Sequence, residues 1–142
     1  MQQRPEKGIY TLILFLSEDR RIMVGSLGAI EFSRGYYSYT GSARGPGGLK
    51  RVDRHIMLSQ GVKQTRRWHV DYLLPHCLFV EAIITRTELN LECQIARGIG
   101  ERLKPQPRFG CTDCSCISHL HYSEKLEEIK EMVVLAHERA RI

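Results

Sequence analysis

Two short segments that lie far apart in the chain each combine tyrosine with glycine: GIY at residues 8–10 and YTG at residues 39–41. Downstream, Arg51 and His55 are four residues apart, which places both on one face of a helix. Glu92 lies in the first turns of another expected helix. Phosphodiester hydrolysis uses such groups, because a metal ion and a guanidinium stabilise the negative charge that develops on the phosphoryl and leaving oxygens. These residues therefore indicate phosphoryl chemistry, provided that the fold brings them together.

The metal and proton chemistry would divide among these groups. One carboxylate can hold Mg²⁺ or Mn²⁺ when waters and a substrate phosphate complete the coordination. Tyrosine has a pKa of about 10 and is a poor base at neutral pH unless nearby positive charge, here Arg51 or the metal, lowers that pKa. His55 is an alternative base. Each residue also has an ordinary reading, namely strand packing, helix packing or solvated surface.

Basic residues gather between these groups. Arg44–Arg67 contains seven Lys and Arg residues against one acid, Asp53, in a chain whose formal net charge is +5. Such a cluster favours a polyanion because each neutralised phosphate releases condensed counterions, although a solvated basic face is the alternative. Trp68 could stack on an unpaired base or anchor a short helix. The candidate nucleic-acid-binding residues are Arg44, Lys50, Arg54, Lys63, Arg66, Arg67 and Trp68.

A second cluster of polar residues follows near the C-terminus. Three cysteines and two histidines fall within eleven residues: Cys111, Cys114, Cys116, His119 and His121. Thiolates and imidazoles at this density could hold Zn²⁺, but four ligands from one short loop are sterically demanding, so a reduced structural or substrate-binding loop is the alternative. The candidates for this second site or loop are His69, Asp71, Asp113, Cys114, Cys116 and His119. Cys77 and Cys93 are expected to be ordinary buried thiols.

The elements that must position these residues form an α/β pattern. Strands are expected at Gly8–Ser17, Tyr36–Gly41 and Leu78–Thr85, and Arg21–Val24 is expected to return as a hairpin partner. The glycine-rich segment Gly25–Gly35 is expected to be irregular.

Helices are expected to alternate with these strands. One follows the break at Gly45–Gly48 and spans Leu49–Ser59, and a short one at Trp68–Leu74 is stopped by Pro75. A third is capped by Thr87 or Asn90 and runs to about Lys104. The last is capped by Ser123 and buries Leu126, Ile129, Val133 and Ala136. The pattern predicts a small, largely antiparallel sheet covered by helices.

Length and composition set outer bounds. At 142 residues, 42% of them hydrophobic, the chain has the size of one domain, residues 1–142. No apolar run approaches the roughly 20 residues that span a bilayer, and the N-terminus lacks the apolar stretch of a secretory signal. We therefore expect a cytoplasmic protein without membrane contact. Five cysteines, an odd number, argue against a disulfide framework.

Six segments, taken in order, resemble the GIY-YIG nuclease superfamily. They are GIY at 8–10, YYSYTGSARGPGGL at 36–49, RVDRH at 51–55, WHVDYLL at 68–74, LECQIA at 91–96 and FGCTDCSCISHL at 109–120. The likeness is greatest to an archaeal-type branch of unknown function, which also occurs fused to endonuclease III-like proteins. The second motif reads YTG in place of YIG, and Thr40 is β-branched like isoleucine.

The resemblance implies a three-stranded antiparallel sheet with flanking helices, to which the last helix is an addition. It implies that Tyr10 is the general base or orients the attacking water, and that Tyr39 contacts the scissile phosphate. Arg51 matches the helix arginine, with Arg54 as the fallback, and Glu92 matches the carboxylate that holds Mg²⁺ or Mn²⁺. The implied activity is metal-dependent cleavage of nucleic acid, DNA rather than RNA, with repair proteins as partners.

Two other functions remain open at this point. A nucleic-acid-binding module could keep the fold and the basic surface without turnover, and its salt-sensitive binding would survive loss of Glu92. A zinc-stabilised interaction domain would instead depend on the Cys/His segment and unfold with chelator.

Overall fold

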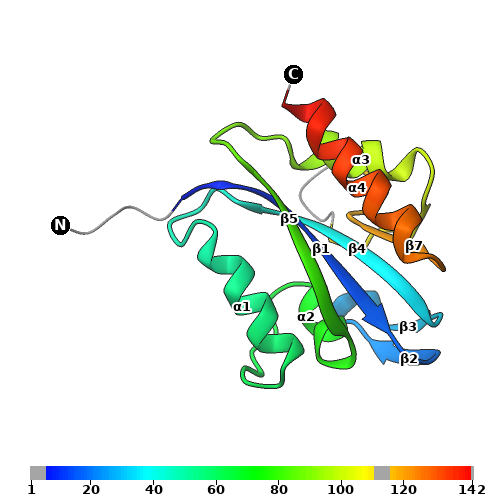
Figure 1. Cartoon of the computed structure of the whole chain (residues 1–142). Helices are drawn as coiled ribbons and strands as arrows, with labels where there is room; N and C mark the ends of the chain where they lie inside the picture. The colour runs from blue at the N-terminus through cyan, green and yellow to red at the C-terminus, as the bar shows by residue number, and fades with distance from the viewer. Residues whose placement is uncertain (1–5, 111–115, 142) are drawn as a thin grey trace.

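A central antiparallel sheet carries helices on both faces, as Figure 1 shows for a computed structural model that describes residues 6–110 and 116–141. Within these residues the sheet has five strands in the order β5-β1-β4-β7-β6. Their bounds are Leu78–Arg86 for β5, Gly8–Leu16 for β1, Gly35–Ala43 for β4, Leu120–Ser123 for β7 and Lys104–Pro105 for β6. The α/β class and the antiparallel sheet expected from the sequence are confirmed.

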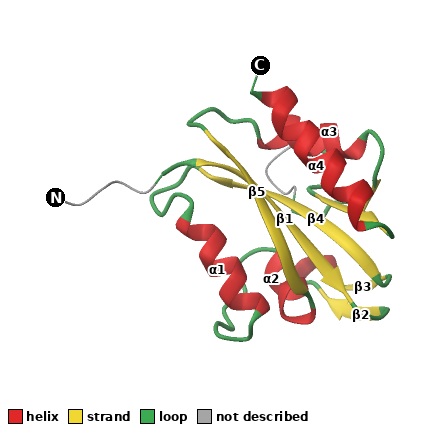
Figure 2. Ribbon diagram, in the orientation of Figure 1, coloured by secondary structure: helices red, strands yellow, loops and turns green. Residues whose placement is uncertain are grey.

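The alternation of side chains along β1 builds two cores, one on each face of the sheet. Tyr10, Leu12 and Leu14 belong to a cluster that packs under α1 (Lys50–Ser59) and α2 (Val70–Leu73). Ile9 and Ile13 face the opposite side, where α3 (Glu92–Gly100) and α4 (Leu126–Ala140) cover the sheet. Figure 2 shows these helices on either side of the strands. Because β1 is central and buried on both faces, its sequence is almost uninterruptedly apolar.

The resemblance implies a sheet of three strands, but the described part of the chain forms a sheet of five. β7 pairs with β4 over Tyr36–Tyr39, and β6 adds two residues beyond it. Neither strand was predicted, because both are short and flank the cysteine-rich segment. They cover the edge of β4 that a smaller sheet would leave open at that end.

The expected hairpin between the first strand and Arg21–Val24 is wrong. β1 is already paired on both edges, with β4 and β5, so it offers no edge to a further strand. Instead β2 (Arg20–Met23) pairs with β3 (Ala29–Phe32) in a separate two-stranded sheet. The segment expected to be irregular thus contains β3 and a 3-10 turn at Gly25–Leu27.

The middle two helices differ from expectation at their ends. α3 begins at Glu92 with Leu91 at the N-cap position and no capping side chain, and it ends at Gly100 because Lys104 and Pro105 enter the sheet as β6. The expected caps at Thr87 and Asn90 are therefore wrong. The α-helix α2 ends at Leu73, before Pro75. The chain then continues as a 3-10 turn at Leu74–His76, which contains Pro75.

Ser123 supports the start of the last helix without being its cap. Lys125 occupies the N-cap position of α4, and its backbone N–H donates to the Ser123 hydroxyl at 3.1 Å. That hydroxyl in turn donates to a carboxylate oxygen of Glu128 at 2.9 Å. The expected apolar face of this helix is confirmed, with Ile129 and Val133 fully buried. Across the described part of the chain, no helix is both long and apolar enough to span a membrane.

Candidate functional site

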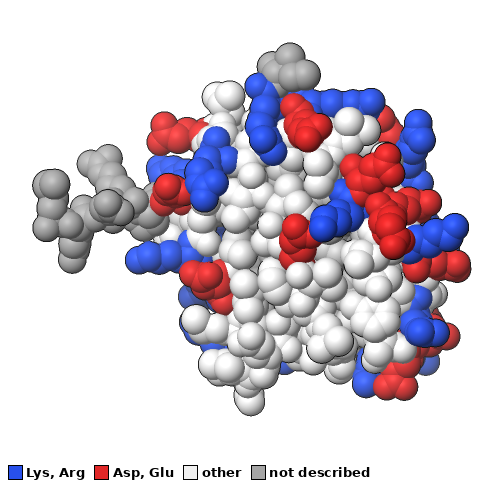
Figure 3. Space-filling model, in the orientation of Figure 1, with Lys and Arg blue, Asp and Glu red and all other residues white. Residues whose placement is uncertain are grey.

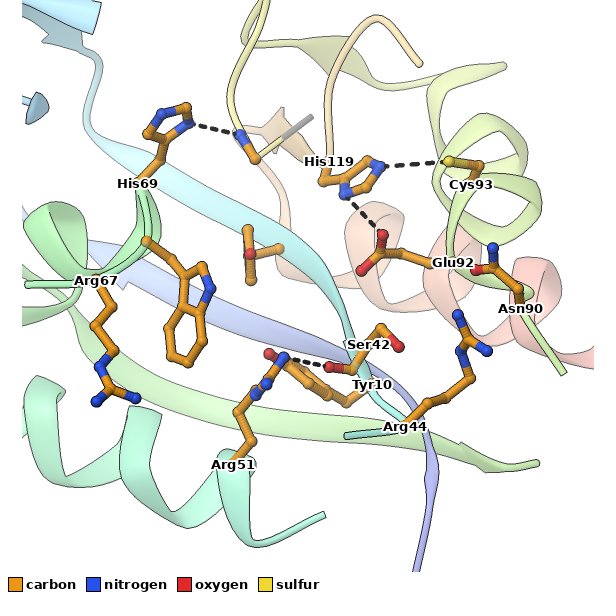
Figure 4. A pocket seen from close by; sticks show the side chains of 13 residues that line it. Tyr10, Ser42, Arg44, Arg51, Arg67, His69, Asn90, Glu92, Cys93 and His119 are labelled. Atoms are coloured by element: carbon orange, nitrogen blue, oxygen red, sulfur yellow. Dashed lines mark hydrogen bonds and ion pairs between the residues drawn. The ribbon is translucent and has the colours of Figure 1, made fainter. Parts of the chain in front are cut away.

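A pocket of about 500 Å³ opens where β1, β4, the first turn of α1 and the start of α3 meet. Four of the residues singled out from the sequence line it: Tyr10, Tyr39, Arg51 and Glu92. Figure 4 labels Tyr10, Arg51 and Glu92 among the lining side chains. The four residues come from four different elements. The convergence that the sequence analysis required is therefore present in the fold.

The strand register places the two tyrosines side by side. In the antiparallel pairing of β1 with β4, Tyr10 is opposite Gly41 and Leu12 is opposite Tyr39. Tyr39 is two residues from Gly41 and so projects from the same face of the sheet as Tyr10. The ring centroids of the two tyrosines are 6.5 Å apart. Both phenols therefore reach the same pocket.

Glycines make room for both phenols. A Cβ atom at position 41 would collide with the ring and hydroxyl of Tyr10. Gly110 has a φ of +74°, and a Cβ atom there would lie 3.0 Å from the ring of Tyr39. The glycine of the YTG segment is thus required by the packing of Tyr10 on the neighbouring strand.

His55 lies behind Tyr10 and does not line the pocket. Its side chain is 1% exposed, and its Nε2 is 2.7 Å from the Tyr10 hydroxyl. Its Nδ1 lies 3.9 Å from an oxygen of Asp71, too far for a hydrogen bond, yet that carboxylate favours a proton on Nδ1. Nε2 is then the acceptor, and the Tyr10 hydroxyl donates to it. The expected alternative base thus contacts a tyrosine rather than a substrate.

Burial dominates the proton affinities around the two tyrosines. Desolvation raises the pKa of Tyr10 well above its ordinary value, the neighbouring Tyr39 adds to this rise, and Arg51 opposes it. Burial, followed by the charge of Glu92, also raises the pKa of Tyr39. Without a metal ion, the effect of Arg51 on Tyr10 that the sequence suggested is outweighed, and both side chains are neutral phenols at pH 7.

The same desolvation acts on His55 in the opposite direction. Burial lowers the pKa of His55 to about 4, although the charge of Asp71 acts to raise it. At neutral pH His55 is therefore an uncharged imidazole with a free lone pair for the Tyr10 proton.

Arg51 is the helix arginine that reaches the pocket. Its Nη1 donates to the backbone carbonyl of Ser42 on β4 at 2.6 Å. Its guanidinium also lies over the ring of Trp68, 4.5 Å from the ring centroid. These two contacts fix the position of the positive charge beside Tyr10.

Arg54, the fallback for the same role and a candidate nucleic-acid contact, is committed elsewhere. It makes a bidentate ion pair with Asp71, at 3.2 and 3.0 Å, and its guanidinium lies 4.6 Å from the Trp68 centroid. Asp71 is fully buried and also accepts the backbone N–H groups of Arg67 and Trp68. Burial acts to raise the pKa of this carboxyl, but these donors and the Arg54 charge hold it below its ordinary value. Asp71 is therefore a structural anchor behind the pocket.

Trp68 and His69 enter the pocket from the turn that precedes α2. Trp68 provides the aromatic surface over which the guanidiniums of Arg51 and Arg54 lie. His69 accepts a hydrogen bond at Nδ1 from the backbone N–H of Gly110 at 2.9 Å, and burial lowers its pKa. The neutral ring thus carries its proton on Nε2.

Positive charge exceeds negative charge in the pocket lining. Arg44 and Arg67 join Arg51 there, whereas Glu92 is the one carboxylate among the described lining residues. The remaining candidate contacts, Lys50, Lys63 and Arg66, are exposed and lie outside the lining. The face seen in Figure 3 carries Lys and Arg side chains as well as Asp and Glu side chains.

Glu92 is flanked by sulfur and nitrogen donors that the sequence analysis did not connect with it. Its Oε1 lies 3.7 Å from Nδ1 of His119, whose Nε2 lies 3.8 Å from Sγ of Cys93 (Figure 4). The ligand atoms of Cys93, Cys116 and His119 all lie within 4.8 Å of one another, and such a cluster could hold a metal ion.

Two expectations about the cysteines change as a result. Cys77 is buried as expected, but Cys93 is partly exposed and lines the pocket. His121 is not part of this cluster. Its ring packs against Gly100, where a Cβ atom would lie 2.9 Å from Nε2 of His121. Asp113 and Cys114, also candidates from the sequence, lie outside the described residues.

Three further lining residues carried no signal of their own in the sequence. They are Ser42, Asn90 and Cys93, each of which adjoins or nearly adjoins a residue that was singled out. Proximity to Glu92 along the chain is the one hint that pointed to Asn90, which precedes α3, and to Cys93 within it, but the sequence does not select which neighbours of Glu92 face the pocket.

A family model described as a domain of unknown function, DUF123, matches residues 9–142. Comparison with curated proteins and with solved structures finds no significant match.

Proposed function

The chain belongs to the family described as a domain of unknown function, DUF123, and from its pocket we propose that it is a divalent-metal-dependent endonuclease of the GIY-YIG type. The description of that family names no activity, so the proposal rests on the site. The observation that carries it is the convergence of two phenols, one fixed guanidinium and one carboxylate on a single hollow of about 500 Å³. Such a set matches the needs of a phosphodiester that is being hydrolysed.

Glu92 would hold the metal ion. Its side chain is 24% exposed, and the lining of the same pocket also contains oxygen-bearing side chains, namely those of the two tyrosines, Ser42 and Asn90. Mg²⁺ and Mn²⁺ prefer oxygen ligands and need few of them from the protein, so the donor set fits. When bound, such an ion supplies Lewis-acid stabilisation of negative charge on phosphoryl oxygens.

Arg51 would bind the phosphate and stabilise its developing charge. Its position is fixed before substrate arrives, by the Ser42 carbonyl and the Trp68 ring, so it needs little reorganisation during the reaction. Arg44 and Arg67 add positive charge to the lining and would draw the phosphate backbone into the pocket. Tyr39 would donate its neutral hydroxyl to a phosphate oxygen, because burial keeps it protonated.

Tyr10 would orient the attacking water and pass its proton on. The phenol is protonated at neutral pH and donates to His55, which leaves the phenolic oxygen free to accept from water in the pocket. A proton received by Tyr10 can be matched by transfer of its own proton to Nε2 of His55. Tyr10 then remains neutral throughout, and the charge moves to an imidazole that faces Asp71.

Nucleic acid is the substrate class that this pocket favours, and DNA with a role in repair is our specific proposal. Three arginines line the pocket, and the polyanion would continue over the exposed Lys50, Lys63 and Arg66. A small diester would use the pocket but gain nothing from that outer basic surface.

The test is cleavage of a panel of duplex, single-stranded, flap and abasic DNA, and of RNA, with Mg²⁺ or Mn²⁺. We expect metal-dependent cutting that falls by about 10²–10³-fold or more in Glu92→Gln, because the metal ligand is lost while the shape is kept. Glu88→Gln is the matched control, since Glu88 is exposed and does not line the pocket. Cleavage by folded Glu92→Gln at the wild-type rate would exclude the proposed role of Glu92.

A binding module without turnover is the second candidate, and the small number of acidic groups favours it. A single carboxylate among the described lining residues is the least that a metal-dependent nuclease can have. This alternative predicts no cutting across the panel, together with DNA binding in EDTA that weakens steeply with salt and survives Glu92→Gln. Fluorescence anisotropy with labelled DNA measures that binding directly.

A further inference from the structure

Three soft or borderline donors meet next to Glu92 but outside its oxygen set. Cys93 comes from the first turn of α3, and Cys116 and His119 come from the segment that leads into β7. Their ligand atoms all lie within 4.8 Å of one another, and Cys116 and His119 are buried. Residues so far apart in sequence gain such proximity only through the tertiary fold.

The spacing of these donors fits a tetrahedral metal ion. Zn²⁺ binds thiolate sulfur at about 2.3 Å and imidazole nitrogen at about 2.0–2.1 Å, so two such ligands of one tetrahedral ion lie about 3.6 Å apart. Sγ of Cys93 and Nε2 of His119 are 3.8 Å apart. A hard ion such as Mg²⁺ would not choose two sulfurs and a nitrogen, so this cluster and Glu92 select different metals.

We propose that Cys93, Cys116 and His119 form a structural Zn²⁺ site that abuts the pocket. This site differs from the one considered in the sequence analysis, because it takes a ligand from α3 and does not use His121. It also relieves the crowding expected for ligands drawn from one short loop. The proposal does not depend on nuclease activity and holds for a catalytic or a non-catalytic protein.

The zinc would fix the histidine that faces Glu92. With Nε2 on the metal, His119 carries its proton on Nδ1, and that nitrogen lies 3.7 Å from Oε1 of Glu92 (Figure 4). In many zinc sites the histidine that binds the metal through one ring nitrogen donates its other N–H to a carboxylate, and the carboxylate thereby orients the ring. Here the same contact would also hold Glu92 in position at the pocket, which ties the two sites together.

Three protein ligands leave the fourth position of a tetrahedral ion open to a further donor.

The experiment measures metal content and Co²⁺ binding on the full-length protein. We expect about one equivalent of zinc in the purified wild type, and Co²⁺ added to metal-free protein should give the thiolate charge-transfer bands of a tetrahedral site. Cys93→Ser and Cys116→Ser should each weaken Zn²⁺ affinity by at least about tenfold, because each variant removes one thiolate ligand. Cys77→Ser is the matched control, because Cys77 is a buried thiol in the opposite core.

Circular dichroism separates loss of a ligand from loss of the fold in each variant. Wild-type protein that takes up neither Zn²⁺ nor Co²⁺ would overturn the proposal, as would folded Cys93→Ser that binds Zn²⁺ as tightly as wild type. Glu92→Gln distinguishes this site from the proposed nuclease site: it should lose cleavage and keep its zinc. Zinc in a protein that cuts none of the substrates would support the metal site alone.

Discussion

The Tyr10 hydroxyl contacts His55, which belongs to a group of residues that do not line the pocket. It lies 2.7 Å from Nε2 of His55, whose other nitrogen faces Asp71, and Asp71 is held in turn by a bidentate contact with Arg54. Tyr10 is therefore the end of a buried chain of four polar groups. Because a buried chain of this kind is sensitive to loss of one member, its inner residues should influence the chemistry at Tyr10.

His55→Ala tests this dependence. We expect kcat for DNA cleavage to fall by about 10²-fold or more, because Tyr10 loses the acceptor of its proton, whereas KM should change little, since His55 does not line the pocket. His76→Ala, at an exposed histidine, is the control. Steady-state initial rates over a range of DNA concentrations give the two constants separately. A folded His55→Ala protein with wild-type kcat would show that Tyr10 works without this acceptor.

At the scale of elements, the pairing of β1 with β4 aligns the two motifs of the chain. Tyr10 is opposite Gly41, so the phenol of one motif fills the space left by the glycine of the other. The spacing of each motif along its own strand thus matters less than the register between the strands. A slip by one residue would move Tyr10 or Tyr39 to the opposite face of the sheet.

Gly41→Ala tests that register contact. The added methyl group would collide with the Tyr10 phenol, so we expect a loss of about 1–3 kcal/mol in the free energy of unfolding and lower cleavage activity. Gly47→Ala is the control, because a Cβ atom there meets nothing within 4 Å. Urea denaturation of both variants measures the difference. Equal stability of the two would mean that Tyr10 can move aside without cost.

Strong local patterns made some elements predictable. β1, β4 and β5 and the helices α1 and α4 follow from apolar runs and helical periodicity, and they lie close to their expected bounds. The sequence did not predict β6 and β7, because strands of two and four residues form on the edge of a partner strand and their own composition gives little signal. The pairing expected for Arg20–Met23 was wrong because the sequence does not show that both edges of β1 are already paired, with β4 and with β5.

The candidate site was predictable to a similar degree. Residue types and order named Tyr10, Tyr39, Arg51 and Glu92, and the structure places them in one pocket. The sequence could not show that His55 is buried behind Tyr10, since that depends on how deep α1 packs. It also gave no reason to join Cys93 to His119, which is 26 residues away and reaches it only across the sheet edge.

At the scale of the whole molecule, each core contains a buried neutral histidine. His55 lies in the layer under α1, and His137 of α4 lies against the opposite face of the sheet. The ring nitrogens of His137 are 2.8 Å from the hydroxyl of Thr11 and 2.9 Å from that of Thr85. Arg141 donates to the same Thr85 hydroxyl, at 3.3 Å. Burial, and for His137 also the Arg141 charge, lowers the pKa of each histidine to about 4.

These low pKa values make the stability of the whole fold depend on pH. An unfolded histidine has a pKa of about 6.5, so unfolding takes up protons between that value and pH 4, and stability must fall as the pH drops through this window. Above pH 6.5 the contribution is fully present, and it amounts to about 3 kcal/mol for a histidine as buried as His137. We expect the free energy of unfolding, measured in urea from pH 4 to 8, to decline below pH 6.5, and less steeply in His137→Gln, which cannot titrate. A parallel decline in wild type and variant would assign the acid sensitivity to other groups.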